Sequence, residues 1–278
     1  GNAQANVAEN ALNNTRVLTA SATDPDDGDT LSYAITGGNQ AGHFAINPNS
    51  GAITVAGPIN YESNDTYTLA IRVSDGQLTD SAIFTIDVTD VNEAPNLNNA
   101  QANVAENTLN NTLVFTASAS DPDDGDTLTY AITDGNNAGR FAINPNSGAI
   151  TVTGPIDFES VASYTLTIRV SDGTLNDAAA LTISVTDVNE APSLGDAQAS
   201  VTENAPEDTL VFTAAGTDPD AGEVLSYTII GGNNAGHFAI DQNTGAITVA
   251  GPIDFETNNA YTLAIRVSDG ILSDAASL

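Results

Sequence analysis

The residues in this sequence that could do chemistry are carboxylates, and they return at fixed places along the chain. The motifs Val-Ala/Thr-Glu-Asn and Asp-Pro-Asp each occur three times, at intervals of 97 residues (104 − 7 and 201 − 104). They stand at 7–10, 104–107 and 201–204, and at 24–26, 121–123 and 218–220. Most of the recurring acids fall at strand ends or in loops. Carboxylates in such places are candidate ligands for hard cations.

Composition narrows the classes of protein and of site. The 278 residues carry 36 Asp and Glu against 5 Arg and no Lys, a formal net charge of −31. This surface is predicted to repel nucleic acid and anionic membranes and to attract cations. Without cysteine there are no disulfides or thiolate metal sites. No run of 18 apolar residues is present, so membrane insertion is not expected.

A catalytic role finds no support among the residues. The two histidines, His43 and His237, occupy equivalent repeat positions, and Arg140 stands there in the second copy. Residues exchanged in this way are seldom a catalytic base. No Cys or Lys nucleophile, no G-x-S-x-G motif and no Gly-rich phosphate loop occurs. We therefore predict that the chain is not an enzyme.

The elements that must position the carboxylates read as strands. Apolar residues alternate with polar ones over 67–74 and 82–88, and a further strand is expected around 31–35. A hairpin is predicted from Phe44/Ile46 to Ile53/Val55 through the turn-forming segment 47–51. About seven short strands in roughly 97 residues predict an all-β fold of antiparallel, seven-stranded Greek-key sandwiches of the immunoglobulin-like kind, arranged end to end.

The repeat divides the chain into 1–95, 96–192 and 193–278. Leu278 corresponds to Leu181, and the residues that follow it in the second copy, 182–187, have no counterpart in the third. The third sandwich is therefore expected to lack its last strand. An unpaired sheet edge is unfavourable. Either the natural chain continues past Leu278, which we favour, or a neighbouring subunit supplies a donor strand.

The motifs together resemble those of cadherin repeats, particularly the bacterial cadherin-like type, over the whole chain. The second copy shows all of them in order. They are X-E-N at 105–107, D-x-D at 121–123, D-x-E at 157–159, Asp172 in Val-Ser-Asp-Gly, and the D-x-N-E-x-P linker at 187–192, which also stands at 90–95. The resemblance implies that calcium binds between successive repeats, with about three ions at each joint.

Carried over by position, the resemblance implies two sets of calcium ligands and two half-sites. The first joint would use Glu9, Glu62, the Val91 carbonyl, Asn92, Glu93, Asp121, Asp123 and Asp172. The second joint would use Glu106, Asp157, Glu159, the Val188 carbonyl, Asn189, Glu190, Asp218, Asp220 and Asp269. The half-sites at the ends would be Asp24, Asp26 and Asp75, and Glu203, Asp254 and Glu256. All are oxygen ligands, which suit calcium better than zinc or copper.

Three features depart from the family pattern or extend it. Asn60 stands where the second copy has Asp157, so the first joint is expected to bind calcium more weakly. Glu93 and Glu190 replace the Asp usual in animal cadherins. We expect the additional acids of the D-x-D loops to be solvated loop residues rather than a variant site; they are Asp27, Asp29, Asp124 and Asp126.

The resemblance implies a secreted or cell-surface protein with a structural or adhesive function. We predict a calcium-rigidified rod segment of a giant surface adhesin or extracellular filament, with neighbouring repeats or identical subunits placed head to tail. The alternative is a polysaccharide-binding module, which needs exposed aromatics. There is no Trp, and the 15 Tyr and Phe share six repeated positions that packing explains. A third interpretation is that the acidic surface keeps the protein of a halophile solvated, without binding specific ions.

Overall fold

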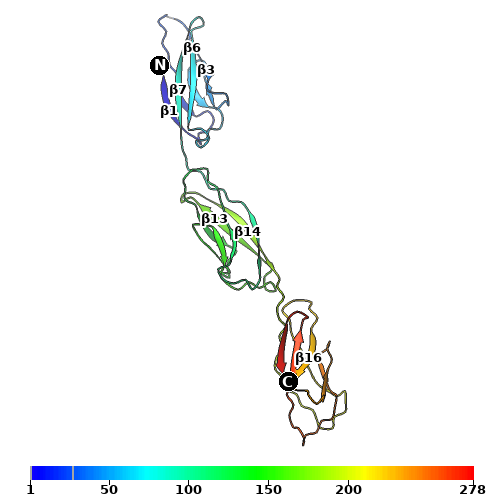
Figure 1. The fold of residues 1–278 in the computed structure, drawn as a ribbon. Coiled ribbons are helices and arrows are strands. Elements are labelled where there is room, and N and C mark those ends of the chain that lie inside the picture. Colours follow the sequence, from blue (N-terminus) through cyan, green and yellow to red (C-terminus); the bar gives the residue numbers. More distant parts are fainter. Residues whose placement is uncertain (1, 27) are drawn as a thin grey trace.

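Three β-rich units follow one another along the chain and are joined by narrow connections (Figure 1). The computed structural model describes residues 2–26 and 28–278. Within these residues every regular element is a strand. None of the described elements is a helix that could cross a membrane.

Repeats 1 and 2 have seven strands each, and repeat 3 has six. Repeat 1 contains β1 (Ala3–Ala8), β2 (Arg16–Thr19), β3 (Ser32–Gly37), β4 (Phe44–Ile46), β5 (Ala52–Val55), β6 (Thr66–Ser74) and β7 (Thr79–Thr89). Repeat 2 contains β8 (Ala100–Ala105), β9 (Leu113–Thr116), β10 (Thr129–Asp134), β11 (Phe141–Ile143), β12 (Ala149–Val152), β13 (Ser163–Ser171) and β14 (Asn176–Thr186). Repeat 3 contains β15 (Leu210–Thr213), β16 (Ser226–Gly231), β17 (Phe238–Ile240), β18 (Ala246–Val249), β19 (Ala264–Ser268) and β20 (Ser273–Ser277).

Each repeat is a sandwich of two sheets. In repeat 1 the sheets have the orders β1-β7-β6-β3 and β2-β5-β4, and repeat 2 reproduces both. The pairings are antiparallel except for the first strand, which runs parallel to the last, with Val7 opposite Val88. That exception brings the beginning and the end of a repeat together. It is what places the X-E-N motif beside the linker.

The alternating patterns form the strands that they predict. In β6, Leu69 and Ile71 are buried while Thr68 and Arg72 are exposed. The hairpin also forms as expected, with Phe44 opposite Val55 and Ile46 opposite Ile53. In its turn the Asn47 side chain accepts the N–H groups of Asn49 and Ser50, both at 3.0 Å, and Gly51 takes a positive φ of 68°. Glycine is favoured there because it has no Cβ.

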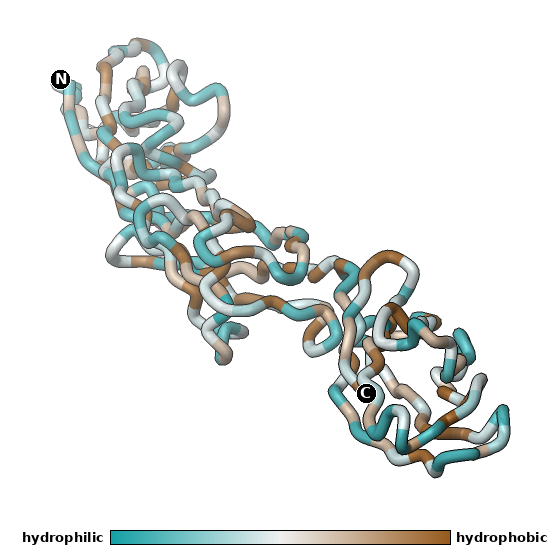
Figure 2. The backbone as a smooth tube through the Cα atoms, turned by 60° about the horizontal axis from the view of Figure 1, so that its bottom comes forward, coloured by the Kyte–Doolittle hydropathy of each residue, from teal (hydrophilic) through white to brown (hydrophobic). Residues whose placement is uncertain are grey.

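The three hydrophobic cores are separate, each built from residues of one repeat. Apolar segments accordingly recur inside each lobe of the chain (Figure 2). No strand pairs with a strand of another repeat in the described parts of the chain. The repeats therefore depend on the linkers and on the groups around them for their relative orientation.

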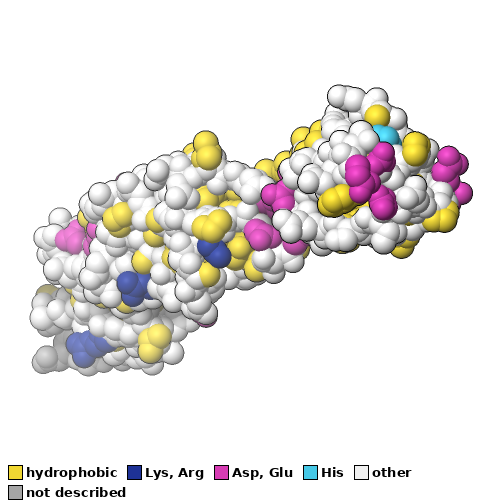
Figure 3. All heavy atoms as spheres, turned by 90° about the horizontal axis from the view of Figure 1, so that it is seen from below, with side chains coloured by type: hydrophobic (Ala, Val, Ile, Leu, Met, Phe, Trp, Pro, Cys, Tyr) yellow, Lys and Arg dark blue, Asp and Glu magenta, His cyan; other side chains and the backbone are white. Residues whose placement is uncertain are grey.

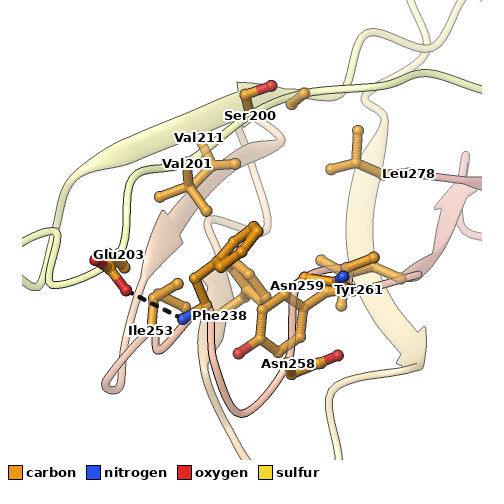
Figure 4. Close-up of a pocket in the computed structure, with 14 residues that line it drawn as sticks. Ser200, Val201, Glu203, Val211, Phe238, Ile253, Asn258, Asn259, Tyr261 and Leu278 are labelled. Carbon is orange, nitrogen blue, oxygen red and sulfur yellow. Dashed lines mark hydrogen bonds between the residues drawn. The ribbon is translucent and has the colours of Figure 1, made fainter.

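The last strand of repeat 3 is shortened but not absent, whereas the sequence predicts that it is missing. β20 covers five residues, whereas β7 and β14 cover eleven each. The segment 198–202, equivalent to most of β1, forms no strand there. A pocket of about 370 Å³ opens between Val201, Phe238, Tyr261 and Leu278. Figure 4 shows Val201 and Leu278 on opposite sides of this opening.

One expectation about aromatic side chains is wrong. Five of the six repeated aromatic positions pack in or against a core, but the position of Tyr61 does not do so in every repeat. Tyr61 is 36% exposed and Phe255 is 61% exposed. Both lie in the D-x-E loop and line open pockets, whereas the equivalent Phe158 packs against the core of repeat 2.

Candidate calcium centres at the repeat joints

A buried glutamate organises the first half of each joint. Glu106 follows β8 and is 2% exposed, and Glu9, which follows β1, is 6% exposed. The Oε1 atom of Glu106 accepts the Val188 N–H of the linker at 2.7 Å. Its Oε2 atom accepts the Phe158 N–H of the D-x-E loop at 2.8 Å. Glu9 makes the equivalent two bonds at the same distances. This glutamate thus holds the first strand, the loop and the linker together.

The linker reaches the next repeat through two further acids. The Glu190 N–H donates to Asp220 Oδ2 at 2.7 Å, and Asn189 Nδ2 donates to Asp269 Oδ2 at 2.9 Å. The first joint has the same bonds, from Glu93 to Asp123 and from Asn92 to Asp172. Just after each linker proline, the chain forms an isolated bridge with the residue that precedes D-x-D. The linker is therefore bonded to both of the repeats that it connects.

These elements bring carboxylates into compact groups. In each group one oxygen of every member lies within 4.8 Å of the others. The second joint holds Glu106, Glu159, Asp187 and Asp220; the first holds Glu9, Glu62 and Asp90, then Glu62, Glu93 and Asp123, then Asp121, Asp126 and Asp172. Figure 3 shows Asp and Glu side chains gathered where two lobes meet. At each joint a glutamate of D-x-E and an aspartate of D-x-D thus converge although they come from different repeats: Glu62 with Asp123, and Glu159 with Asp220.

Sequence reasoning missed the first residue of each linker. Asp90 and Asp187 belong to the groups above. Their signal was present, because each is the leading acid of the recurring D-x-N-E-x-P motif. Asp29 and Asp126 are expected to be solvated loop residues, and both are exposed. Nevertheless Asp126 joins Asp121 and Asp172, and Asp29 joins Asp24 and Asp75. Asp27 lies outside the described residues, and Asp124 is exposed beside an open pocket at the first joint.

Several expected ligands make other contacts. Asp157 accepts the N–H and the hydroxyl of Ser160, both at 2.9 Å, which caps the turn of the D-x-E loop. Glu190 Oε1 accepts Asn107 Nδ2 at 2.8 Å. Asp218 accepts the Asp220 N–H, and Asp26 donates its N–H to Asp24. At the end of the chain Asp254 accepts the Glu256 N–H. Glu203 holds the Phe255 N–H at 3.3 Å, and this bond is drawn in Figure 4.

Buried oxygen atoms without a partner mark both joints. Within the described residues, Glu93 Oε2, Asp121 Oδ2, Asp123 Oδ1, Asp218 Oδ2 and Asp220 Oδ1 are buried and accept no hydrogen bond. Asp220 as a whole is only 9% exposed. A buried carboxylate oxygen without a partner is unfavourable unless a cation satisfies it. The donor set contains no nitrogen or sulfur ligand, so these residues fit calcium.

Comparisons with known proteins agree with this geometry. The family model described as "Cadherin domain" matches residues 3–89, 100–186 and 197–277. The chain belongs to the cadherin family. Human protocadherin Fat 4 is 36% identical over 285 residues, which cover 96% of this chain and 6% of that protein. Human cadherin EGF LAG seven-pass G-type receptor 2 is 34% identical, over 96% of this chain and 10% of its own length.

Solved cadherin structures share the fold. Repeats EC22-24 of mouse cadherin-23 superpose with a TM-score of 0.76 at 24% identity, covering 99% of this chain and 92% of that one. The extracellular cadherin domains 1-5 of protocadherin gamma B2 give a TM-score of 0.75 at 22% identity, covering 99% and 57%. Cadherin repeats bind calcium at their joints, which agrees with the donor set found here. The bacterial subtype expected from the motifs finds no support in these comparisons.

The crowded carboxylates perturb one another. Partial desolvation raises the pKa of Asp90, of Glu93 and of Asp187, and repulsion from neighbouring acids adds to it, led by Glu9 for Glu93 and by Asp220 for Asp187. The side-chain hydrogen bonds from Asn92 and Asn189 hold the pKa of Asp172 and of Asp269 below its usual range. When no cation is bound, the joints therefore contain some carboxylates whose ionised form is destabilised and others whose ionised form is stabilised.

We expect the thermal stability of the calcium-free chain to rise as the pH is lowered from 7. A carboxyl whose folded pKa is raised destabilises the fold above that pKa, and protonation relieves the penalty. Carboxyls with a lowered pKa act oppositely, because their stabilisation is lost as the pH falls below the ordinary value of 3.8. Thermal melts in chelator from pH 7 to pH 3 should therefore pass through a maximum above 3.8. A steady decline from pH 7 would contradict this expectation.

Proposed function

We propose that the three repeats form a calcium-stiffened extracellular rod segment with a structural or adhesive role. The observation that carries the proposal is the pair of joints, where buried and partnerless carboxylate oxygens from two repeats and a linker converge. Cadherin-repeat proteins are structural adhesion proteins, and the solved relatives include extracellular domains. The chain spans 6–10% of the length of the curated relatives described here, so the activity of a whole protein is part of the proposal.

Electrostatics supplies the mechanism. Two carboxylates 4 Å apart repel each other by about 1 kcal/mol in water and by about 4 kcal/mol at an effective dielectric of 20. The separate cores provide little else to hold the repeats in line. Bound calcium would turn this repulsion into attraction across each joint. About three ions per joint, the number usual in the family, would leave the array acidic and soluble.

Chelation is expected to shorten and broaden the distribution of molecular dimensions. With millimolar calcium, small-angle X-ray scattering should give a long and sharply defined maximum dimension. In chelator the joints lose the calcium ions that cross-link them and become free to bend. The melting temperature should fall because calcium binds the folded chain. Magnesium at the same concentration is the control, since it prefers a smaller octahedral site. Identical scattering in calcium and chelator would refute the rod.

Wider assembly follows from the same joints. The half-sites Asp24, Asp26 and Asp75, and Glu203, Asp254 and Glu256, would complete a joint with a further repeat or with an identical subunit placed head to tail. The opening in repeat 3 would accept a donor strand beside the segment 198–202. We infer a cell-surface location, in a giant adhesin or an extracellular filament, from these features and from the family.

A polysaccharide-binding role is the second candidate, and one observation favours it. Tyr61 is 36% exposed and lines an open pocket of about 510 Å³ at the first joint. Glu62, Asp65, Asp90 and Asp124 share this pocket. An exposed aromatic face beside carboxylates can stack on a sugar ring and accept its hydroxyl groups. Sedimentation of the calcium-loaded chain with insoluble polysaccharides, compared with Tyr61→Ala, tests this role.

A further inference from the structure

The D-x-E loop differs between the two joints at one position that contacts a joint carboxylate. Asn60 occupies this position at the first joint and Asp157 occupies it at the second. We propose that Asn60 makes the first joint the low-affinity calcium joint, which releases calcium first and serves as the hinge of the segment. This inference rests on the proposed function and concerns the difference in calcium affinity between the two joints.

Asn60 donates a hydrogen bond to Glu62, a carboxylate that belongs to two of the groups at the first joint. Its Nδ2 atom donates to Glu62 Oε2 at 2.8 Å. Glu62 belongs both to the group with Glu9 and Asp90 and to the group with Glu93 and Asp123. A hydrogen-bond donor on a carboxylate oxygen competes with a cation for the same lone pairs. The amide therefore weakens a ligand shared by two carboxylate groups.

The substitution changes charge without changing the backbone. Asn60 Oδ1 accepts the Ser63 N–H at 2.7 Å, and Asp157 Oδ1 accepts the Ser160 N–H at 2.9 Å. Both loops are thus capped in the same way. What the first joint lacks is one negative charge. Calcium affinity rises with the number of charged ligands, so this joint should bind more weakly.

The backbone contacts of the buried glutamates and the linker bonds are closely matched between the two joints. Glu9 and Glu106 accept their two backbone N–H groups at 2.7 and 2.8 Å. The bonds from the linkers to D-x-D, and from the linker asparagines to the later Asp, also agree in length between the joints.

Two differences act in the opposite direction. At the second joint Asn107 Nδ2 donates to Glu190 Oε1 at 2.8 Å, so a donor also competes for a joint carboxylate there. Asp124 stands at the first joint where repeat 3 has Ala221, so it adds a negative charge near Glu62 and Asp90. Asp124 is exposed, and so is Asp157, so water and salt screen both charges. The contribution of Asp124 should be smaller than that of Asn60, which touches Glu62. Substitution of Asp124 separates the two effects.

The test is a calcium titration of the full chain followed by nuclear magnetic resonance. The backbone amides of Val91 and Val188 each donate to the buried glutamate of one joint, so they report the joints separately. We expect the Val91 signal to reach its midpoint at about tenfold higher calcium than the Val188 signal. Asn60→Asp should move the Val91 midpoint toward that of Val188. Asp157→Asn should move the Val188 midpoint the other way.

The controls distinguish this inference from the proposed function. Asp124→Ala should leave the order of the two midpoints unchanged. Equal midpoints in the unaltered chain, or a Val91 midpoint that Asn60→Asp does not shift, would overturn the role of Asn60 and leave the calcium rod intact. If neither amide responds to calcium, the proposed function itself fails. Scattering at intermediate calcium should show that bending begins while the second joint is still loaded with calcium.

Discussion

Replacing Glu106 by alanine should destabilise repeat 2 by about 3 kcal/mol even in chelator, because two part-buried backbone N–H groups lose their acceptor. Glu106 is 2% exposed, and its two oxygens hold Val188 and Phe158. These bonds tie the end of β8 to the linker and the D-x-E loop whether or not a cation is present. The residue is therefore a structural pin as well as a candidate ligand.

Hydrogen exchange measured on the full chain can assign this loss to one repeat. Three repeats with separate cores need not unfold in one step, so a single melting temperature would not locate the effect. The amides of β8 and β14 should lose protection in Glu106→Ala, while those of repeat 1 should not. The protection of β8 and β14 in Glu106→Gln should lie between that of the unaltered chain and that of Glu106→Ala, since the amide keeps one acceptor oxygen. Glu207→Ala, an exposed acid, is the control. Unchanged protection of β8 in chelator would show that Glu106 acts only through calcium.

Asp220→Asn should have opposite effects with and without calcium. Asp220 is 9% exposed, its Oδ2 atom accepts the Glu190 N–H, and its Oδ1 atom has no partner. The asparagine oxygen can keep the bond to Glu190 while the charge beside Glu106, Glu159 and Asp187 is removed. In chelator the variant should gain about 1 kcal/mol from reduced repulsion. With calcium it should lose a charged ligand, and affinity at the second joint should fall about 100-fold.

Calcium titration calorimetry and thermal melts in chelator and in calcium measure the two halves of this prediction. The contrast between conditions is the informative result, because a packing defect would destabilise the chain in both. Glu207→Gln removes one charge from an exposed position and should change neither quantity by a comparable amount. Destabilisation in chelator would mean that the Asp220 charge is already compensated within the protein. Unaltered calcium binding would remove Asp220 from the ligand set.

The sequence alone predicted most of the fold because its signals are local. Alternation such as that of Leu69 and Ile71 requires only that one face of a strand be buried, and the Asn47–Gly51 segment carries its own turn chemistry. The interval of 97 residues repeats these local signals three times. Family motifs then indicated which acids belong to the joints. These motifs include Glu9, Glu106 and Asp220, which the structure buries.

Tertiary structure decided what depends on distant segments. The parallel pairing of β1 with β7 joins residues 81 positions apart, as in Ala3 opposite Phe84, and no local pattern specifies it. That pairing places Glu9 beside the linker and brings Asp90 into its group of carboxylates. Likewise, the contact of Asn60 with Glu62 depends on side-chain direction in an irregular loop. The sequence determined which carboxylate oxygens are available. The parallel pairing of the first and last strands of a repeat determined which of those oxygens lie close enough to share a cation.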